Sequence, residues 1–226
     1  ILMQTITVRE AIEQLQAAYF FDMVESDGQL KFVKRGGTSV ATIAGDDMVP
    51  LTKGGNIREV VEIHRAQELD LPKEVNVSYI NRVANYDPGL QRSMRQTTDA
   101  VDKVGLNLPI VLTDQEAKTI ADVTLYNGWI QRVSYKFNAP AKYSSIEPTD
   151  IVTIDVDGVQ SQVRVRATRT EYSGLMQIEA VAEDVASYDF YTEPGEHTTT
   201  EQPGQIVPGT RLELLDIPAL PNDTAA

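Results

Sequence analysis

The sequence predicts an α+β fold with mostly antiparallel strands and two principal helices. Three features support this prediction: two capping boxes that each begin an apolar helical periodicity, short segments in which apolar and polar residues alternate, and glycine-containing turns between such segments. The chain has 226 residues, of which 42% are hydrophobic and 23% are charged, which is the composition of a folded globular protein. Two modules suit this length.

The opening unit is predicted to be a helix followed by a hairpin. Thr7 and Glu10 have the spacing at which two side chains cap each other's free backbone N–H groups, and the helix that they begin runs to about Tyr19. Segments 20–25 and 30–34 then flank a tight turn that contains Asp-Gly. The helix is expected to bury one apolar face in a core, formed by Val8, Ala11, Ile12, Leu15, Ala18 and Tyr19.

The middle of the chain is less regular. Glycine and proline interrupt it up to residue 57, and 58–66 then offers a short strand. Val75, Val77 and Tyr79 alternate with polar residues, as in a strand that has one solvent-exposed face. The segments expected to follow are a turn at 86–89, a continuing strand at 91–96 and a short apolar approach at 106–112.

A second helix and a meander are predicted in the following part. Thr113 and Glu116 repeat the capping-box spacing, and the helix that they begin is expected to reach Trp129 or Gln131. An extended segment then ends at Pro140. Three antiparallel strands joined by short turns are predicted at 151–156, 162–168 and 176–182.

These elements suggest three regions. We expect a helix–hairpin module at 1–70, a β-rich module with one helix at 71–190, and a linker with the start of a following domain at 191–226. The linker is inferred from its threonine, glutamate, proline and glycine content, and the following domain from the apolar segment 212–220. Because the chain begins with Ile1 and not with methionine, we expect it to be cut from a longer polypeptide.

Composition excludes several classes of function. The sequence has no cysteine, so it can form neither a disulfide nor a thiolate metal site. The net charge of -13 opposes the neutralisation of phosphates on which sequence-independent nucleic-acid binding depends. No apolar stretch approaches the roughly 20 residues that a membrane span requires.

We found no catalytic, cofactor-binding or metal site in the sequence. The two histidines, His64 and His197, lack partners at ligand spacing, and neither a nucleophile elbow nor a phosphate-binding loop is present. Asp155, Asp157 and Gly158 resemble the start of a calcium loop, but the glutamate at its end is missing, so a hairpin turn is favoured. The adjacent pair Asp46-Asp47 is expected to be solvated.

Two further possibilities remain open at this stage. A pair of glycosidase carboxylates needs only to meet in space, and the sequence nominates no particular pair. Six aromatic residues are expected to pack in the core, although they would also suit a platform for sugars. They are Tyr79, Tyr86, Tyr126, Trp129, Tyr135 and Tyr143.

In their order along the chain, several segments resemble the hub or tail-tip proteins of tailed phages and of phage-derived gene transfer agents. One departure is Thr149, which stands where the family's Pro-Gly-Asp strand entry has glycine. The segments are 7–12 (TVREAI), 20–28 (FFDMVESDG), 71–72 (LP) before 75–80 (VNVSYI), 87–89 (DPG), 108–112 (LPIVL) before 117–121 (AKTIA), 129–132 (WIQR), 147–152 (EPTDIV) and 214–218 (LLDIP).

The resemblance implies a structural, non-catalytic protein of the virion. Proteins of this kind have β-barrel-like modules, assemble as trimeric rings and join the tail tube, or a distal tail protein, to a central spike or fibre. By this resemblance the chain is made in the bacterial host cytoplasm and surrounds the path of the DNA. An acidic inner surface would let DNA pass without adhering. The alternative is a module that binds a cell-surface glycan during host recognition.

Overall fold

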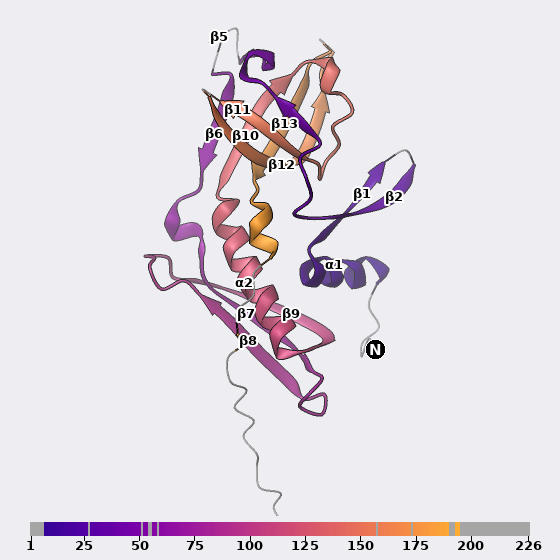
Figure 1. Ribbon diagram of the computed structural model, residues 1–226, viewed down its shortest axis with the longest axis vertical. Helices are drawn as coiled ribbons and strands as arrows, with labels where there is room; N and C mark the ends of the chain where they lie inside the picture. Colours follow the sequence, from indigo (N-terminus) through magenta and orange to yellow (C-terminus); the bar gives the residue numbers. More distant parts are fainter. Residues whose placement is uncertain are drawn as a thin grey trace, which may run out of the picture.

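The computed structural model describes residues 7–189, except 27, 51, 54, 55, 58, 157 and 173, together with residues 193 and 194. Two sheets lie at opposite ends of the molecule, with a long helix between them and a shorter helix and a hairpin at one side (Figure 1). Each sheet has its own cluster of buried apolar side chains.

The larger sheet has six strands in the order β3-β11-β12-β13-β10-β6. Neighbouring strands are antiparallel, except that β3 runs parallel to β11. Phe137, Ile154 and Ile178 lie at the centre of its core and are fully buried. The strands are β3 (Ala41–Ile43), β6 (Val61–Arg65), β10 (Val133–Ala139), β11 (Ile151–Val156), β12 (Val159–Thr170) and β13 (Met176–Ala182).

The smaller sheet has three strands, with β7 (Pro72–Asn81) between β8 (Pro88–Met94) and β9 (Asp102–Leu112). The helix α2 (Asp114–Ile130) packs on one face of this sheet, where Val75 and Val77 of β7 are fully buried. Thr113 and Glu116 form the predicted capping box. At the other end of α2, the indole N–H of Trp129 donates a hydrogen bond of 2.9 Å to the carbonyl of Pro72.

The helix α1 (Val8–Tyr19) and the hairpin of β1 (Phe21–Ser26) and β2 (Gln29–Lys34) form the side of the molecule (Figure 1). Thr7 and Glu10 form the predicted capping box. The helix ends at Phe20, which has a φ of 52°, and this left-handed conformation turns the chain into β1.

The expectation that the whole apolar face of α1 is core is wrong. Ala18 is the one buried residue of this helix, whereas Val8 is 78% exposed and Tyr19 is 56% exposed. The reason is geometric. Only the C-terminal part of α1 reaches the smaller core, where Ala17, Ala18 and Phe20 pack.

The remaining elements are short. Strands β4 (Thr52–Lys53) and β5 (Asn56–Ile57) pair with each other. The 3-10 turns are η1 (Gly45–Asp47), η2 (Glu68–Asp70), η3 (Ala141–Tyr143) and η4 (Val185–Tyr188).

The α+β class, the two helices, the hairpin and the three-strand meander are confirmed. Segment 102–112 is a full strand and not a short approach, because it pairs in parallel with β7.

Within the described part of the chain no closed barrel forms, since β3 and β6, at the two ends of the larger sheet, do not pair. Strands β3 and β6 precede residue 70, but they pair with strands that follow it. The expected division of the chain into regions at residues 70 and 190 stays a prediction.

Thr149, which stands where the Pro-Gly-Asp strand entry has glycine, adopts a backbone conformation that favours glycine. Thr149 has a φ of 85°, in the left-handed region that favours glycine. Its backbone N–H donates to the carbonyl of Val165, and Val165 donates to the carbonyl of Asp150, both over 2.8 Å. These bonds hold the β-branched residue in an unfavourable conformation at the entry to β11.

Candidate functional site: the arginine junction

A buried group of charged side chains joins the hairpin to the larger sheet. Arg164 of β12 donates from Nη1 to Asp22 of β1 over 3.1 Å and from Nε to Glu183 over 3.2 Å. Arg35, just after β2, donates to both carboxylate oxygens of Asp22 over 2.6 and 2.9 Å. The hydroxyl of Tyr188 donates to Glu183 over 2.6 Å. We call these five residues the arginine junction.

The junction is buried at one end and partly buried at the other. The side chains of Arg164 and Glu183 are 9% and 1% exposed, whereas those of Asp22 and Arg35 are 17% and 27% exposed. Two guanidinium groups therefore lie against two carboxylates in a region of low dielectric, where an unpaired charge is strongly unfavourable. Removing one charged side chain would therefore leave another without one of its hydrogen-bonded counter-charges.

The surroundings of the junction raise the pKa values of Arg35 and Tyr188, which favours the protonated forms that donate hydrogen bonds. Burial alone would lower the pKa of Arg35, but the hydrogen bonds and the charge of Asp22 outweigh burial and raise it. Burial, followed by the hydrogen bond to Glu183, raises the pKa of the Tyr188 hydroxyl well above its ordinary value. Arg166 lies nearby, and its pKa is lowered by burial and then by the charges of Arg164 and Arg35.

A second contact fixes the far end of the hairpin. Ser26 donates to Glu147 over 2.5 Å, and Lys31 donates to Ser26 over 2.6 Å. Asp22, Ser26 and Lys31 all lie on one face of the hairpin, because residues two apart in a strand, and residues directly opposite across a pair, share a face. This face is attached to β12 of the larger sheet at one end and to the loop before β11 at the other.

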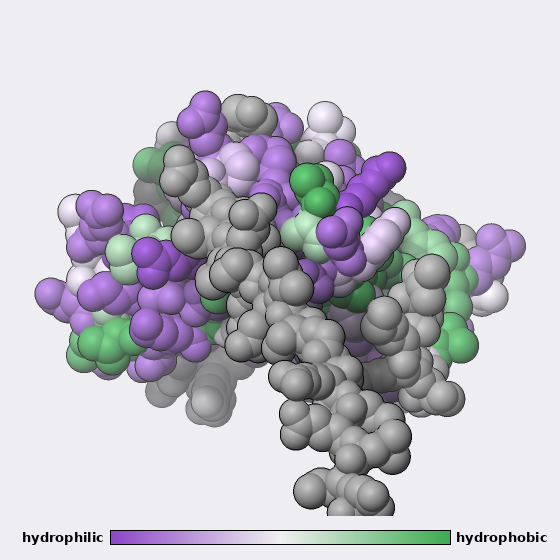
Figure 2. Space-filling model, turned by 90° about the horizontal axis from the view of Figure 1, so that it is seen from below, coloured by the Kyte–Doolittle hydropathy of each residue, from purple (hydrophilic) through white to green (hydrophobic). Residues whose placement is uncertain are grey.

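The opposite face of the hairpin is apolar and open. Leu30 is 62% exposed and Phe32 is 60% exposed, and the rings of Phe21 and Phe32 meet edge to face at 5.7 Å. In the view from below, hydrophobic side chains gather along the right-hand margin, on the side where α1 and the hairpin lie (Figure 2). The junction thus presents these aromatic side chains in a defined orientation.

The outcomes for the sequence-based candidates are mixed. His64 lies exposed on β6, whereas His197 lies outside the described residues. Asp155 and Gly158 belong to the predicted hairpin turn, in which Asp155 accepts from the Gly158 N–H over 2.9 Å, and Asp157 is outside the described residues. Throughout the described part of the chain, no group of three or more His, Asp or Glu is arranged to hold a metal ion.

The expectation that the pair Asp46-Asp47 is merely solvated is wrong for Asp47. Lys142 donates to Asp47 over 2.6 Å, and the hydroxyl of Tyr143 donates to it over 2.8 Å. The hydrogen bond from Lys142, and then that from Tyr143, lower the pKa of Asp47. Asp47 therefore links the loop after β3 to the loop after β10.

The aromatic residues do not form one platform. Tyr79 and Trp129 are buried in the smaller core, Tyr135 and Tyr143 pack beside the larger core, and Tyr86 and Tyr126 are exposed. The hydroxyl of Tyr79 donates to Asp114, and burial together with this bond raises the pKa of Tyr79. Core packing is thus confirmed for four of the six residues.

Sequence reasoning did not identify the arginine junction. Val163 and Val165 are buried in the larger core, so Arg164 between them belongs to the opposite face of β12, which alternation alone marks as solvent-exposed. The hairpin that covers this face precedes Arg164 by more than a hundred residues. No local signal could have revealed the pairing.

The comparisons with known proteins now decide the family. Residues 7–168 match the family described as "Putative phage tail protein". The chain belongs to this phage tail protein family. A comparison with curated proteins finds no match.

Solved structures agree with this family. A chain from the virion of a native gene transfer agent particle is similar to 84% of this chain, with 27% identity and a TM-score of 0.72. The tail protein from Neisseria meningitidis MC58 is similar to 82% of the chain, with 13% identity and a TM-score of 0.51. The 43 kDa tail protein of prophage MuSo2 from Shewanella oneidensis is similar to 82%, with 10% identity and a TM-score of 0.50.

The phage tail chain spans only part of these proteins. It covers 41% of the gene transfer agent chain, 58% of the Neisseria protein and 55% of the Shewanella protein. In the described part of the phage tail chain, neither helix is long and apolar enough to cross a membrane.

Proposed function

We propose that this chain is a structural, non-catalytic part of a tail-tip or baseplate hub that connects the tail tube to a central spike or fibre. Three copies would form a ring around the path of the DNA. The observation that carries the proposal is the similarity of 84% of the chain to a chain of a gene transfer agent virion. The match to the tail family supports the same conclusion.

The arginine junction supports a connecting role. A connector must transmit force between its parts without their sliding, and buried ion pairs hold one geometry because other arrangements leave charges unpaired. Arg164 and Glu183 belong to the larger sheet and the segment after it, whereas Asp22 and Arg35 belong to the hairpin. We therefore propose that the hairpin and the larger sheet move as one unit.

The net charge supports a ring with an acidic inner surface. A charge of -13 gives the chain a field that repels DNA, and such a lining would keep a passing duplex from adhering. We further propose that the chain divides along its sequence into 1–70, 71–190 and 191–226, with the first stretch adding β3 and β6 to the larger sheet of the second. The chain would be made in the bacterial host cytoplasm before assembly into the virion.

The glycan-binding alternative receives less support. The one tryptophan, Trp129, would be the strongest sugar-stacking residue. The guanidinium groups of Arg95 and Arg132 lie over its ring, 4.2 and 5.8 Å from the ring centroid. These contacts compete with a sugar ring. Specific binding of the chain to a glycan array would favour the alternative, and an absence of binding would favour the structural role.

The test of the structural role is the presence of the protein in purified particles. Mass spectrometry of tails separated from capsids should detect peptides of this chain at about three copies per tail, in line with closed cyclic assembly. The matched control is the capsid fraction, which should lack them. Finding the protein only in the soluble lysate would contradict a structural role in the virion.

A further inference from the structure

One edge of the larger sheet is open. Strand β6 pairs with β10 on one side, and in the described part of the chain no strand pairs with its other side. The unpaired backbone N–H and C=O groups of such an edge can receive an additional strand. Ile63, in the middle of β6, is about half exposed, and Val60, just before the strand, is also exposed.

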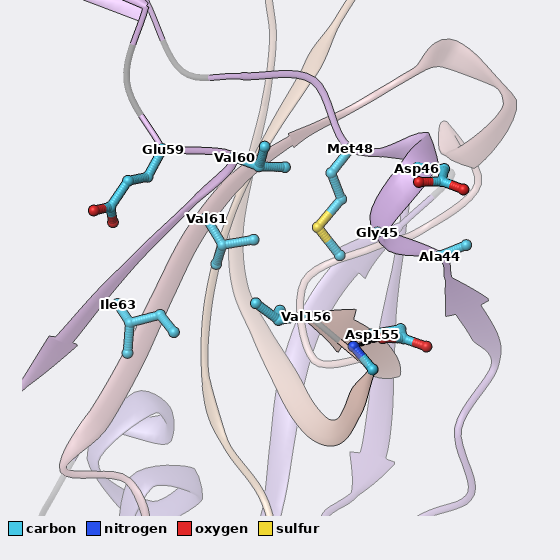
Figure 3. A pocket seen from close by; sticks show the side chains of 11 residues that line it. Ala44, Gly45, Asp46, Met48, Glu59, Val60, Val61, Ile63, Asp155 and Val156 are labelled. Carbon is cyan, nitrogen blue, oxygen red and sulfur yellow. Dashed lines mark hydrogen bonds between the residues drawn. The ribbon is translucent and has the colours of Figure 1, made fainter.

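A groove follows this open edge. It has a volume of about 830 Å³ and lies between β6 on one side and η1 with the turn between β11 and β12 on the other. Figure 3 shows Val61 of β6, Met48 and Val156 converging on the hollow. Val61 and Met48 belong to the buried core of the larger sheet, so the floor of the groove is apolar.

Among the described residues that line the groove, the charged side chains are acidic. They are Asp46, Glu59 and Asp155. Asp155 accepts a hydrogen bond from the Gly158 N–H, whereas Asp46 and Glu59 are exposed and have no hydrogen-bond or ion-pair partner among the described residues. A ligand of the groove therefore meets an apolar floor and a negative rim.

We propose that this groove receives an extended strand from another tail protein, in which apolar side chains alternate with lysine or arginine. The strand would pair with the open edge of β6 and extend the sheet. Successive side chains of a strand point to opposite sides, so apolar residues would fill the floor while basic residues reach Asp46 and Glu59. The identity of the partner as a tail protein rests on the proposed function, whereas the chemistry of the groove does not.

Charge favours such a partner over a second copy of this chain. A second copy, with its net charge of -13, gains no attraction from the acidic rim of the groove. A basic segment is attracted by the same field. The groove therefore selects for charge opposite to that of its own chain.

The test uses the full chain and synthetic peptides. The probe is a capped, fluorescein-labelled peptide of five Val-Arg repeats, and binding is measured by fluorescence anisotropy at low salt. We expect it to bind at least about ten-fold more tightly than a matched peptide of five Val-Glu repeats, because charge complementarity separates the two. Amide NMR shifts should change mainly at residues 59–65, 44–48 and 155–158.

Two further peptides separate strand pairing from general attraction to an acidic protein. A peptide with the same residues in two blocks, five Val then five Arg, keeps the charge and loses the alternation. A Val-Arg peptide with N-methyl groups at alternate positions keeps the side chains and loses the hydrogen bonds of one edge. Each should bind at least about ten-fold more weakly than the alternating peptide.

Charge reversal in the protein supplies the reciprocal control. The double variant Asp46→Lys and Glu59→Lys should bind the Val-Glu peptide more tightly than the Val-Arg peptide. The control variant Asp102→Lys, at an exposed site on β9 away from the groove, should keep the preference of the unaltered chain.

Several results would overturn the proposal. They are equal binding of the alternating, block and N-methylated peptides, NMR shifts elsewhere on the chain, or no binding at millimolar peptide. A concentration-dependent dimer that Ile63→Lys abolishes would instead assign the groove to a second copy. Absence of the protein from particles would contradict the proposed function and leave the peptide results standing, so the two failures are distinguishable.

Discussion

Arg164 and Asp22 are 142 positions apart in the chain, and a guanidinium–carboxylate contact of 3.1 Å joins them. This contact attaches the first hairpin to the central strand region of the larger sheet. Arg35 donates two hydrogen bonds to the same carboxylate, so Asp22 compensates one buried and one partly buried cation.

Removal of the Asp22 carboxylate should therefore be strongly destabilising. Asp22→Ala leaves Arg35 without its hydrogen-bonded partner and Arg164 with Glu183 alone, and we expect a loss of about 3 kcal/mol in the free energy of unfolding. Urea denaturation measures this loss. Asp102→Ala, at an exposed position, should change stability by less than about 0.5 kcal/mol. A loss below about 1 kcal/mol for Asp22→Ala would show that the junction is not a main attachment.

Gly36 should not tolerate a side chain. A Cβ at this position would lie 2.5 Å from the ring of Tyr188, and Gly36 also has a φ of 72°. Gly36→Ala should cost about 2 kcal/mol or more, from overpacking together with backbone strain. The adjacent Gly37 is the matched control, since its Cβ would meet no atom closer than 3.9 Å.

A double variant separates the two causes. Adding Tyr188→Leu to Gly36→Ala removes the ring but not the backbone strain, so the two changes together should cost less than the sum of the single changes. A double-mutant cycle from denaturation curves measures this coupling. Strict additivity would show that the ring contact does not matter.

Thr149→Gly should stabilise the chain. Glycine adopts a φ of 85° without the steric penalty that a β-branched residue meets, and the relief should exceed the extra entropy of the unfolded glycine chain. We expect a gain of about 1 kcal/mol, read from chemical denaturation, and a smaller change for Thr149→Ala. A loss of stability in Thr149→Gly would mean that the threonine side chain contributes more than its conformation costs.

Asp47 should contribute to the pH dependence of stability. Its pKa is lowered by the hydrogen bonds from Lys142 and Tyr143, so the folded chain releases this proton more readily than the unfolded chain. The resulting stabilisation is complete above the unfolded pKa of about 3.9 and is lost as pH falls through the folded pKa. Asp47→Asn should therefore flatten the fall in stability as pH drops below about 4, compared with the unaltered chain. Equal slopes in Asp47→Asn and in the unaltered chain would contradict the assigned contacts.

Local patterns were enough to predict both helices, the first hairpin and the three-strand meander. The pairs Thr7 with Glu10 and Thr113 with Glu116 predicted both helix starts, because a capping box acts between residues three apart. The hairpin turns at Gly28 and Gly158 were likewise local, and both glycines have positive φ.

Long-range pairing could not be predicted in the same way. The parallel pairing of β9 with β7, and of β3 with β11, depends on contacts between segments far apart in the chain. The apolar face of α1 looked like core because periodicity shows which side chains share a face and not what covers that face. The arginine junction was not predicted for the same reason, because the sequence pattern places Arg164 on a face of its strand that is expected to be solvent-exposed.

The position of the chain in an intact tail tests the central claim most directly. Cryo-electron microscopy of the particle, with a density label on the chain, should place three copies in a ring around the central channel at the tail tip, with carboxylates facing the channel. The unlabelled particle is the control. A location on an outer fibre, away from the channel, would contradict both the hub role and the acidic lining.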